Sequence, residues 1–376
     1  MKTTPIAIEL FAGCGGLSTG FLDAGLPITA GFEIDLRAVD AYDYNHIYRG
    51  SKGVAGDLSL MPSDALLQHA GITSLDLVIG GPPCQPFSIV GKRRGVKDER
   101  ADLIGHFVRL ISDLKPLAFL LENVPNLLSI EGGTLFDNAV TQLAALGYSV
   151  RHAVMSAADF GVPQNRKRLI VVGIKGARRI HFPEPTHGLG GTPYLTARVA
   201  IGDLPDAGEF GECGICNHEP TVHSADMVAR FSALRPGKRE RGSFHDRLHP
   251  DRPSFTLRAG SGNFSPLRPV HYRYDRVVTV RESARLQGFG DNFIWPDRIP
   301  RLQQYRQVGN AVPPPLAAAF ARCLAEQMGW LLNPDLTAGN SASRPPAMMM
   351  TDEQRKALRR ARMRGASLGK AALAAE

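Results

Sequence analysis

The chain has 376 residues, 43% of them hydrophobic and 21% charged, an ordinary composition for a globular enzyme with a large core and two structural units. Its five cysteines are irregularly spaced, its first residues do not resemble a signal peptide, and no run of about 18 apolar residues occurs. These features argue against a disulfide framework and a membrane span, so we expect a cytoplasmic protein.

The net charge of +8 is unevenly distributed. Residues 230–306 hold 16 Lys and Arg against 7 Asp and Glu, residues 351–376 hold 7 against 3, and the rest of the chain is mildly acidic. A basic module on an acidic body favours nucleic acid as the partner.

Short apolar segments alternate with helix-like segments over the first half of the chain. The predicted strands are 6–11, 28–33, 75–79, 117–122 and 169–174, with the first helix over 17–25. Continuous apolar strands of this kind are typical of a parallel sheet covered on both faces. We therefore predict an α/β fold with a Rossmann-like, doubly wound, mostly parallel sheet, in which ligands bind at the carboxyl ends of the strands.

The composition of the chain changes near residue 183, where Pro, Gly, His and Arg become frequent. We predict a catalytic and cofactor-binding domain over 1–185, completed by 307–332, and a smaller, irregular, basic domain over 186–306. An apolar helix is expected over 316–331. Residues 333–350 have the composition of a flexible linker. The tail 351–376 begins with Thr351 and Gln354 at capping-box spacing, which indicates a helix.

A glycine-rich turn, 11–16, lies between the first predicted strand and the first helix, and Glu33 follows about twenty residues later. In this context glycines let a nucleotide approach the backbone, and the acidic residue accepts ribose hydroxyl groups. Gly13 and Gly15 have the expected spacing, but Ser18 stands in place of the third glycine. The turn predicts a nucleoside cofactor without choosing one, so an NAD-dependent oxidoreductase stays open at this point.

The segment GGPPCQPFS, residues 80–88, holds Cys84 between prolines. Prolines fix the backbone and remove amide donors, so the segment is a stiff loop. Its thiol is either a small hydrophobic side chain or a positioned nucleophile.

Eight motifs occur in one order: FAGCGGLSTGF, FEID, GD at 56–57, GGPPCQPFS, ENV at 122–124, QNRKR at 164–168, RESARLQGF and YRQVGNAVP. With these motifs the chain resembles the cytosine-C5 DNA methyltransferase family, as found in bacterial restriction-modification systems, over about residues 5–330. The resemblance implies the S-adenosylmethionine-dependent methyltransferase fold, with the target-recognition domain in the basic region 186–306. It also implies transfer of a methyl group to C5 of a flipped-out cytosine in a specific duplex DNA sequence.

The resemblance gives four residues catalytic roles. The thiolate of Cys84 would add to C6 of the base and make C5 nucleophilic. Glu122 would meet the N3 edge and 4-amino group of the base, unless it only caps the following turn. Arg168 would contact the carbonyl oxygen of the base, and Arg166 would contact a phosphate or support a loop, unless either is a plain surface arginine.

The implied cofactor is S-adenosylmethionine, held at the strand ends and closed in by a late segment that returns to the first strand. The expected cofactor-binding residues are Phe11 on adenine, Gly13 and Gly15 at the methionine portion, Glu33 on the ribose, Asp57 on the adenine amino group, and Leu58, Pro83, Asn310 and Val312 around them.

The implied partner is double-stranded DNA, which we expect a monomer to bind in the bacterial cytoplasm, associated with the nucleoid. A cognate restriction endonuclease acting on the same site is a further expected partner. The loop 86–100 resembles the family's mobile loop that closes over the substrate. The expected DNA contacts are Lys92, Arg93 and Arg94 on phosphates, and Arg258, Arg268 and Arg273 in base recognition.

One segment has a pattern similar to that of a zinc site: Cys213 and Cys216 are followed by His218 and His223. A single residue between Cys216 and His218 strains one tetrahedral cluster, so we expect no metal there.

Three other functions remain open on sequence alone. An RNA cytosine methyltransferase of the same fold would share the catalytic set. An NAD-dependent oxidoreductase leaves PPCQ, ENV and QNRKR unexplained. A catalytically dead DNA-binding relative would not need the intact Cys84 and Glu122.

Overall fold

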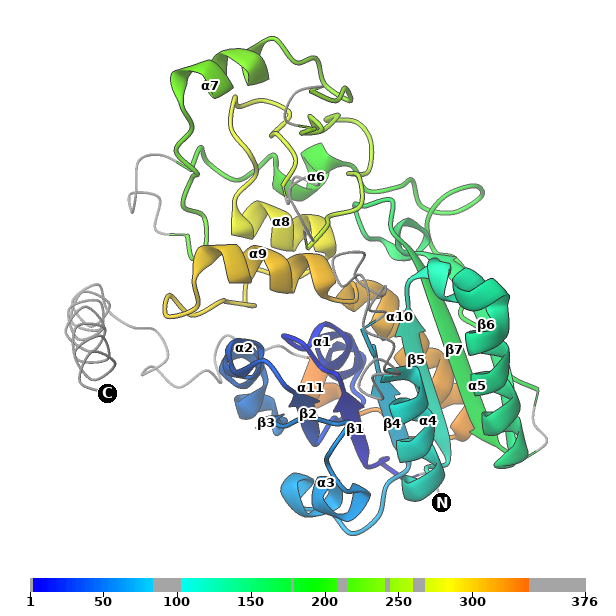
Figure 1. Ribbon diagram of the computed structural model, residues 1–376. Coiled ribbons are helices and arrows are strands. Elements are labelled where there is room, and N and C mark those ends of the chain that lie inside the picture. Colours follow the sequence, from blue (N-terminus) through cyan, green and yellow to red (C-terminus); the bar gives the residue numbers. More distant parts are fainter. Residues whose placement is uncertain are drawn as a thin grey trace, which may run out of the picture. The chain divides into compact units, whose positions relative to one another are not determined.

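The protein is built around one central sheet. A computed structural model describes residues 3–83, 103–176, 179–207, 215–240, 244–259 and 268–337. Within these residues seven strands lie in the order β3-β2-β1-β4-β5-β7-β6 (Figure 1). Neighbours from β3 to β5 are parallel, whereas β7 runs antiparallel to β5 and to β6. The strands are β1 (Ala7–Leu10), β2 (Ala30–Glu33), β3 (Lys52–Ala55), β4 (Leu77–Gly80), β5 (Ala118–Asn123), β6 (Tyr148–Ser156) and β7 (Lys167–Lys175).

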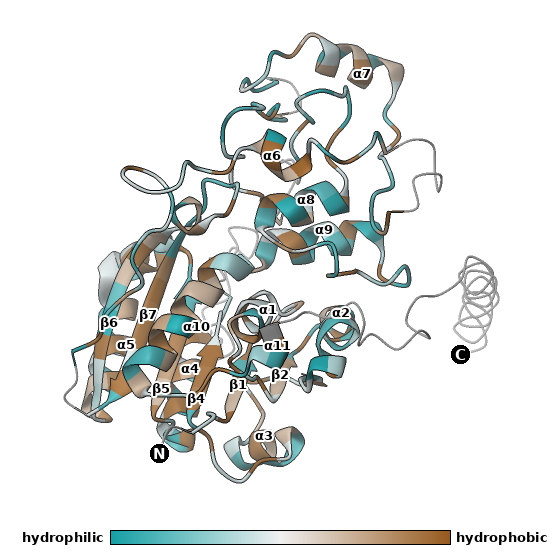
Figure 2. Cartoon of the chain, turned by 180° about the vertical axis from the view of Figure 1, so that it is seen from behind, coloured by the Kyte–Doolittle hydropathy of each residue, from teal (hydrophilic) through white to brown (hydrophobic). Residues whose placement is uncertain are grey.

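Both faces of the sheet are covered by helices. On β4, Leu77 and Ile79 belong to one buried cluster and Val78 to another, as the alternation of side chains along a strand requires. The first cluster joins the sheet to α1 (Gly16–Asp23) and α10 (Pro314–Met328), and the second joins it to α3 (Ser63–Ala70), α4 (Leu103–Leu114) and α5 (Thr134–Ala145). The strands β4, β5 and β7 between these layers are strongly hydrophobic (Figure 2), which explains why the sequence shows continuous apolar runs there.

Shorter helices form a second part of the molecule, seen above the sheet in Figure 1. A third buried cluster, which contains Trp295, joins residues 197–311 to Cys14 and Ala41 of the sheet-containing part. The remaining helices are α2 (Leu36–His46), α6 (Ala197–Ile201), α7 (Ala225–Ser232), α8 (Val280–Gln287), α9 (Arg301–Asn310) and α11 (Pro334–Thr337), with 3-10 turns η1 (Ile47–Arg49), η3 (Pro125–Gly133) and η4 (Ala157–Phe160).

The predicted α/β fold with a mostly parallel sheet is confirmed, and the structure differs from the prediction in several elements. The edge strands β3 and β6 were missed, and helices α6 to α9 occupy a region predicted to be irregular. The position proposed as the end of the small domain, residue 306, lies within α9. The linker predicted over 333–350 begins with the short helix α11, and the rest of it and the basic tail lie outside the described residues.

Candidate active site

The glycine turn after β1 lies beside the end of β2. Glu33 accepts a hydrogen bond of 2.8 Å from the backbone N–H of Gly13, and its other oxygen accepts from the N–H groups of Ile34 and Asp35. Phe11, with a φ of 55°, turns the chain sharply at the strand end. A Cβ atom built on Gly13 would meet nothing within 4 Å, so space is open above the turn. The predicted partners Gly13 and Glu33 are therefore side by side at the carboxyl edge of the sheet.

Gly15 is required where it stands. Its φ of 89° is left-handed, and a Cβ atom there would lie 2.4 Å from His46 and 2.8 Å from Tyr42 of α2. One side of the turn therefore packs against α2, and the other side, at Gly13, is open.

Beneath the turn lies a buried polar network that sequence analysis missed. Ser18, at the position of the absent third glycine, donates from both its N–H and its Oγ to one oxygen of Glu9 on β1. Its Oγ also shares a 2.7 Å hydrogen bond with the hydroxyl of Tyr42, which continues to Ser51. Burial raises the pKa of Glu9 to about 8, against the hydrogen bonds from Ser18 that lower it. The sequence feature that could have revealed this network is Glu9, a glutamate inside an otherwise apolar strand.

The predicted adenine contacts lie at the end of β3. The N–H of Gly56 donates to the carbonyl of Glu33, which brings this segment next to β2. Asp57 accepts at one oxygen from the N–H and the hydroxyl of Ser59. Leu58 is buried in the core shared with α4, so its side chain supports the segment from below. Pro83 is exposed and ends the described part of the loop after β4.

The late segment 310–313 packs against the start of α1. A Cβ atom on Gly16 would lie 2.4 Å from the carbonyl oxygen of Val312. Val312 is itself buried, and Asn310 is exposed at the end of α9. The structure therefore returns this segment to the glycine turn, as predicted for it.

Glu122 and Arg168 form an ion pair on adjacent strands. The Nε of Arg168, on β7, lies 2.7 Å from an oxygen of Glu122 at the end of β5, and both side chains are nearly buried. Burial raises the pKa of Glu122 above its usual value, although Arg168 and Arg166 lower it. Desolvation and the paired cation thus act in opposite directions on the pKa of this carboxyl group. A group balanced in this way can take part in proton transfer.

The loop that leads to Cys84 is anchored on the same strand end. Asn123 donates 2.9 Å from its side-chain amide to the carbonyl of Pro82, and a Cβ atom on Gly81 would lie 3.1 Å from Glu122. Cys84, one residue beyond Pro83, and the predicted phosphate contacts Lys92, Arg93 and Arg94 lie outside the described residues.

Arg166 does not face solvent. It is 1% exposed and donates to the backbone carbonyls of Leu257, Gly309 and Ala311. Of the two roles predicted for it, a phosphate contact is inaccessible to such a side chain in this structure, and support of loops agrees with its bonds.

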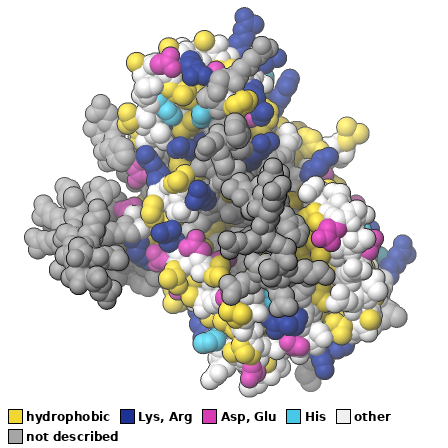
Figure 3. Space-filling model, viewed as in Figure 1, with side chains coloured by type: hydrophobic (Ala, Val, Ile, Leu, Met, Phe, Trp, Pro, Cys, Tyr) yellow, Lys and Arg dark blue, Asp and Glu magenta, His cyan; other side chains and the backbone are white. Residues whose placement is uncertain are grey.

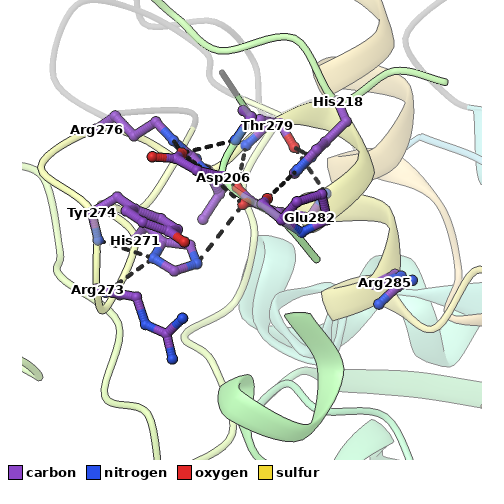
Figure 4. A network of polar contacts seen from close by, with 12 residues as sticks. Asp206, His218, His271, Arg273, Tyr274, Arg276, Thr279, Glu282 and Arg285 are labelled. Atoms are coloured by element: carbon purple, nitrogen blue, oxygen red, sulfur yellow. Dashed lines mark hydrogen bonds and ion pairs between the residues drawn. The ribbon is translucent and has the colours of Figure 1, made fainter. Parts of the chain in front are cut away.

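The region before α8 carries a second polar network (Figure 4). Burial would raise the pKa of Glu282, but two 2.9 Å hydrogen bonds from Arg276 and the charge of that arginine hold it below its usual value. His271 lies 3.8 Å from the same carboxylate and accepts from the N–H groups of Arg273 and Tyr274. Burial lowers the pKa of His271 to about 4, so the neutral ring fixes the turn that carries Arg273.

The other predicted recognition residues are held differently. Arg268 donates to Thr221 at 2.8 Å and lies over the ring of Tyr305. Arg258 belongs to the segment 258–259 that packs on Gly309. On the face seen in Figure 3, Lys and Arg side chains are more frequent over the part with α6 to α9 than over the part below it.

The zinc-like cluster is only partly described, because Cys213 lies outside the described residues. Both ring nitrogens of His218 are engaged, with Thr279 and with the carbonyl of Pro205. His223 accepts from the N–H of Val277. Among the described residues no group of three or more His, Cys, Asp or Glu side chains could hold a metal ion. Nor does any described helix have the length and hydrophobicity to cross a membrane.

Known proteins resemble this chain over most of its length. The family model described as C-5 cytosine-specific DNA methylase matches residues 6–326. The Type II methyltransferase M1.HphI of Haemophilus parahaemolyticus is 37% identical over 332 residues, which cover 84% of this chain and 86% of that protein. M.XorII of Xanthomonas oryzae pv. oryzae is 35% identical over 365 residues, with 84% of each chain covered.

Solved structures share the fold. A prophage-encoded protein of E. coli, described as a DNA modification methyltransferase, superposes with a TM-score of 0.72 at 27% identity and covers 86% of this chain and 99% of its own. The Dnmt2 methyltransferase of S. pombe superposes with a TM-score of 0.61 at 19% identity, covering 87% of this chain and 100% of its own, and supports the fold alone.

Proposed function

The chain belongs to the C-5 cytosine-specific DNA methylase family and is a DNA cytosine-C5 methyltransferase, and we propose how its own residues perform the reaction. The substrate is a cytosine flipped out of duplex DNA, because C5 and C6 are otherwise enclosed in the base stack. Cys84 is the nucleophile, Glu122 and Arg168 hold the base, and the turn after β1 holds the cofactor.

The cofactor is S-adenosylmethionine, which supplies the methyl group when bound. The open space above Gly13 beside the carboxylate of Glu33 fits a nucleoside at the carboxyl edge of the sheet. Glu33 orients the ribose, and Asp57, whose carboxylate is held by Ser59 after β3, contacts the adenine amino group. Phe11, Gly15, Pro83, Asn310 and Val312 are the further residues that we assign to cofactor binding, and Leu58 supports the segment after β3 from the core.

Cys84 activates the base by addition. Its thiolate forms a bond to C6, and the electron pair of the C5–C6 double bond becomes available at C5, which takes up the methyl group. A base then removes the C5 proton, and the electrons of that C–H bond restore the C5–C6 double bond and expel the thiolate. The observation that supports this assignment is the anchoring of the GGPP segment on Asn123, directly after Glu122. One strand end thereby presents both the nucleophile loop and the carboxyl group.

Glu122 and Arg168 bind the base as a unit. A protonated Glu122 donates to N3 and so withdraws negative charge while the thiolate adds to C6. Arg168 fixes the carboxyl group by the 2.7 Å contact of its Nε, and one terminal nitrogen donates to the carbonyl of Lys167. Its other terminal nitrogen contacts the carbonyl oxygen of the base. Arg166 is a supporting residue in this scheme.

The basic region around α6 to α9 binds the DNA. Arg273, Arg258 and Arg268 are its proposed base-reading residues, and Lys92 to Arg94 contact phosphates. A monomer in the bacterial cytoplasm, working at the nucleoid beside a cognate endonuclease, is the setting we propose for it.

Transfer of a labelled methyl group from S-adenosylmethionine tests this function. We expect incorporation into duplex DNA containing the target sequence, none into tRNA, and loss of incorporation when the target cytosine is replaced by 5-methylcytosine. Incorporation into tRNA alone would assign the protein to the RNA methyltransferases, and tighter binding of NAD than of S-adenosylmethionine would restore the oxidoreductase alternative.

A further inference from the structure

Three segments that lie far apart in the sequence meet at a buried group of amide and guanidinium side chains. The segment 163–165 pairs with Ser254, which brings the recognition region against the strand that carries Arg168. Gly309 packs against residues 258 and 259, since a Cβ atom on it would lie 2.8 Å from the backbone there. The third segment, 309–312, closes the cofactor side.

Gln164 and Gln287 occupy the centre of this meeting point, and both are 0% exposed. The side-chain amide of Gln164 donates to the side-chain oxygen of Gln287 at 2.6 Å and to the carbonyl of Leu286 at 3.1 Å. The oxygen of Gln164 accepts from the N–H of Leu257 at 2.9 Å. Gln287 in turn donates to the carbonyl of Ala311.

Arg166 also belongs to this group, through hydrogen bonds to three backbone carbonyls. It donates to Leu257 at 2.9 Å, to Gly309 at 2.6 Å and to Ala311 at 3.2 Å. The carbonyl of Ala311 is therefore shared by Arg166 and Gln287, and Leu257 is held through both its N–H and its C=O. The Nε of Arg166 is buried without a partner, whereas the other bonds of this network join the three segments. Buried hydrogen bonds of this kind rigidify the groups that they join.

Each of the three segments adjoins residues with a different proposed role: base binding, cofactor binding or DNA recognition. Arg166 precedes Arg168, the partner of Glu122, by two residues. Ala311 lies between Asn310 and Val312, and Val312 packs on the first residue of α1. Leu257 precedes Arg258 of the recognition region. Methyl transfer needs the base and the cofactor in near-contact, with the reacting atoms about 3–3.5 Å apart.

We infer that Gln287 is a positioning residue for methyl transfer: through Gln164 and Ala311 it sets the base-binding strand and the cofactor-closing segment in register. This inference rests on the proposed function. Gln287 is buried beneath both parts, so its loss should change the rate of transfer between bound substrates more than it changes either affinity.

The test replaces Gln287 and measures single-turnover transfer with DNA and S-adenosylmethionine both saturating. Gln287→Met keeps the shape but cannot pair with Gln164 or Ala311, and we expect the rate constant to fall by about 10-fold or more, with both dissociation constants within about threefold. Tyr148→Phe is the matched control, because it removes one buried 2.7 Å hydrogen bond at the far edge of the sheet. It should lower the melting temperature and leave the rate unchanged.

Gln287→Glu provides an independent signature. A protonated carboxyl group can accept from Gln164 and donate to Ala311, whereas an ionised one cannot donate, so the rate relative to wild type should recover as the pH falls. A folded Gln287→Met with the wild-type rate, a fall of equal size in Tyr148→Phe, or a Gln287→Glu ratio independent of pH would each overturn the inference. A wild-type protein without methyl transfer to DNA would instead contradict the proposed function.

Discussion

At the end of β5, burial and a paired cation act in opposite directions on the proton affinity of Glu122. Burial raises its pKa, and the nearby Arg168 and Arg166 lower it, with burial the larger effect. A carboxyl group whose pKa is raised takes up a proton more readily, and in its protonated form it can donate a hydrogen bond to a base nitrogen. The neighbouring Arg168 opposes this by favouring the ionised form.

The substitution Glu122→Gln keeps the shape of the side chain and removes its titratable carboxyl group. The amide can still face the base but cannot transfer a proton, so we expect the methyl-transfer rate to fall by about 100-fold or more, with DNA binding largely kept. Rapid-quench measurement of labelled product gives the rate. Turnover within a fewfold of wild type would remove Glu122 from the chemistry.

Glu9 predicts a pH effect on stability. Its pKa is raised from 4.5 in the unfolded chain to about 8 in the folded protein. Between these values the folded state keeps a proton that the unfolded chain gives up, so the contribution of Glu9 to stability declines as the pH rises from 4.5 to 8.

Glu9→Gln removes this titration and keeps an oxygen for Ser18. We expect the stability of the variant relative to wild type to increase with pH in that window, by up to about 1.4 kcal/mol per pH unit. Urea unfolding at several pH values measures the difference. Parallel stability curves for the two proteins would show that Glu9 is ionised in the folded state.

Sequence reasoning found the residues whose position at a strand end is visible in a motif, among them Glu33 and Glu122. It did not find Glu9 or Gln287, because a polar side chain inside a strand or helix has no local pattern that reveals its distant partners. It also left open two roles for Arg166, and only the tertiary contacts with Leu257 and Ala311 distinguish between them.

Among the elements, α1 and α10 are in unusually close contact. Gly20 allows this, since a Cβ atom there would lie 2.3 Å from the carbonyl oxygen of Pro314 and 2.5 Å from the Cβ of Ala317. The contact joins the first helix after the cofactor turn to the helix that follows the late segment 310–313. It thereby keeps two ends of the cofactor site together.

Gly20→Val should force these helices apart. We expect a loss of about 1–3 kcal/mol or more in the free energy of unfolding, together with weaker S-adenosylmethionine binding. Gln68→Val, at an exposed site on α3, introduces the same side chain into a helix and serves as the control. Equal losses in both variants would mean that helix propensity, and not the α1–α10 contact, causes the effect.

The strands at the sheet centre were predictable because they are buried on both faces and read as apolar runs. β3, with the sequence KGVA, and β6 are edge strands with exposed side chains, so this signal is absent. The antiparallel direction of β7 is not encoded in its own residues. Helix α8 could have been found, since Thr279 and Glu282 form the capping box that the structure contains.

At the scale of the whole molecule, the uneven charge divides DNA binding into two parts. Residues 230–306 carry a surplus of nine positive charges, and the tail 351–376 carries a surplus of four. A tail beyond the family match neutralises phosphates without reading base edges, so we predict that it contributes equally to all sequences.

Deleting the residues from 340 onward should therefore flatten the salt dependence of DNA binding and leave the preferred site unchanged. Arg273→Gln is the contrasting variant and should reduce discrimination between sites by about 1–3 kcal/mol if Arg273 contacts a base with both nitrogens. Titrations with cognate and scrambled duplexes at several salt concentrations measure both effects. A truncation that changes which sequence is methylated would make the tail part of the recognition surface.

Covalent catalysis requires that Cys84 form a bond to the target base during methyl transfer. Duplex DNA with 5-fluorocytosine at the target position tests it most directly, because the fluorine replaces the proton that must leave C5 before the thiolate can depart. With S-adenosylmethionine present, we predict a denaturation-resistant protein–DNA complex whose cross-linked peptide maps to Cys84, and no such complex with Cys84→Ala. A wild-type protein that methylates normal DNA yet forms no stable complex with the fluorinated duplex, or a cross-link at another residue, would contradict the account.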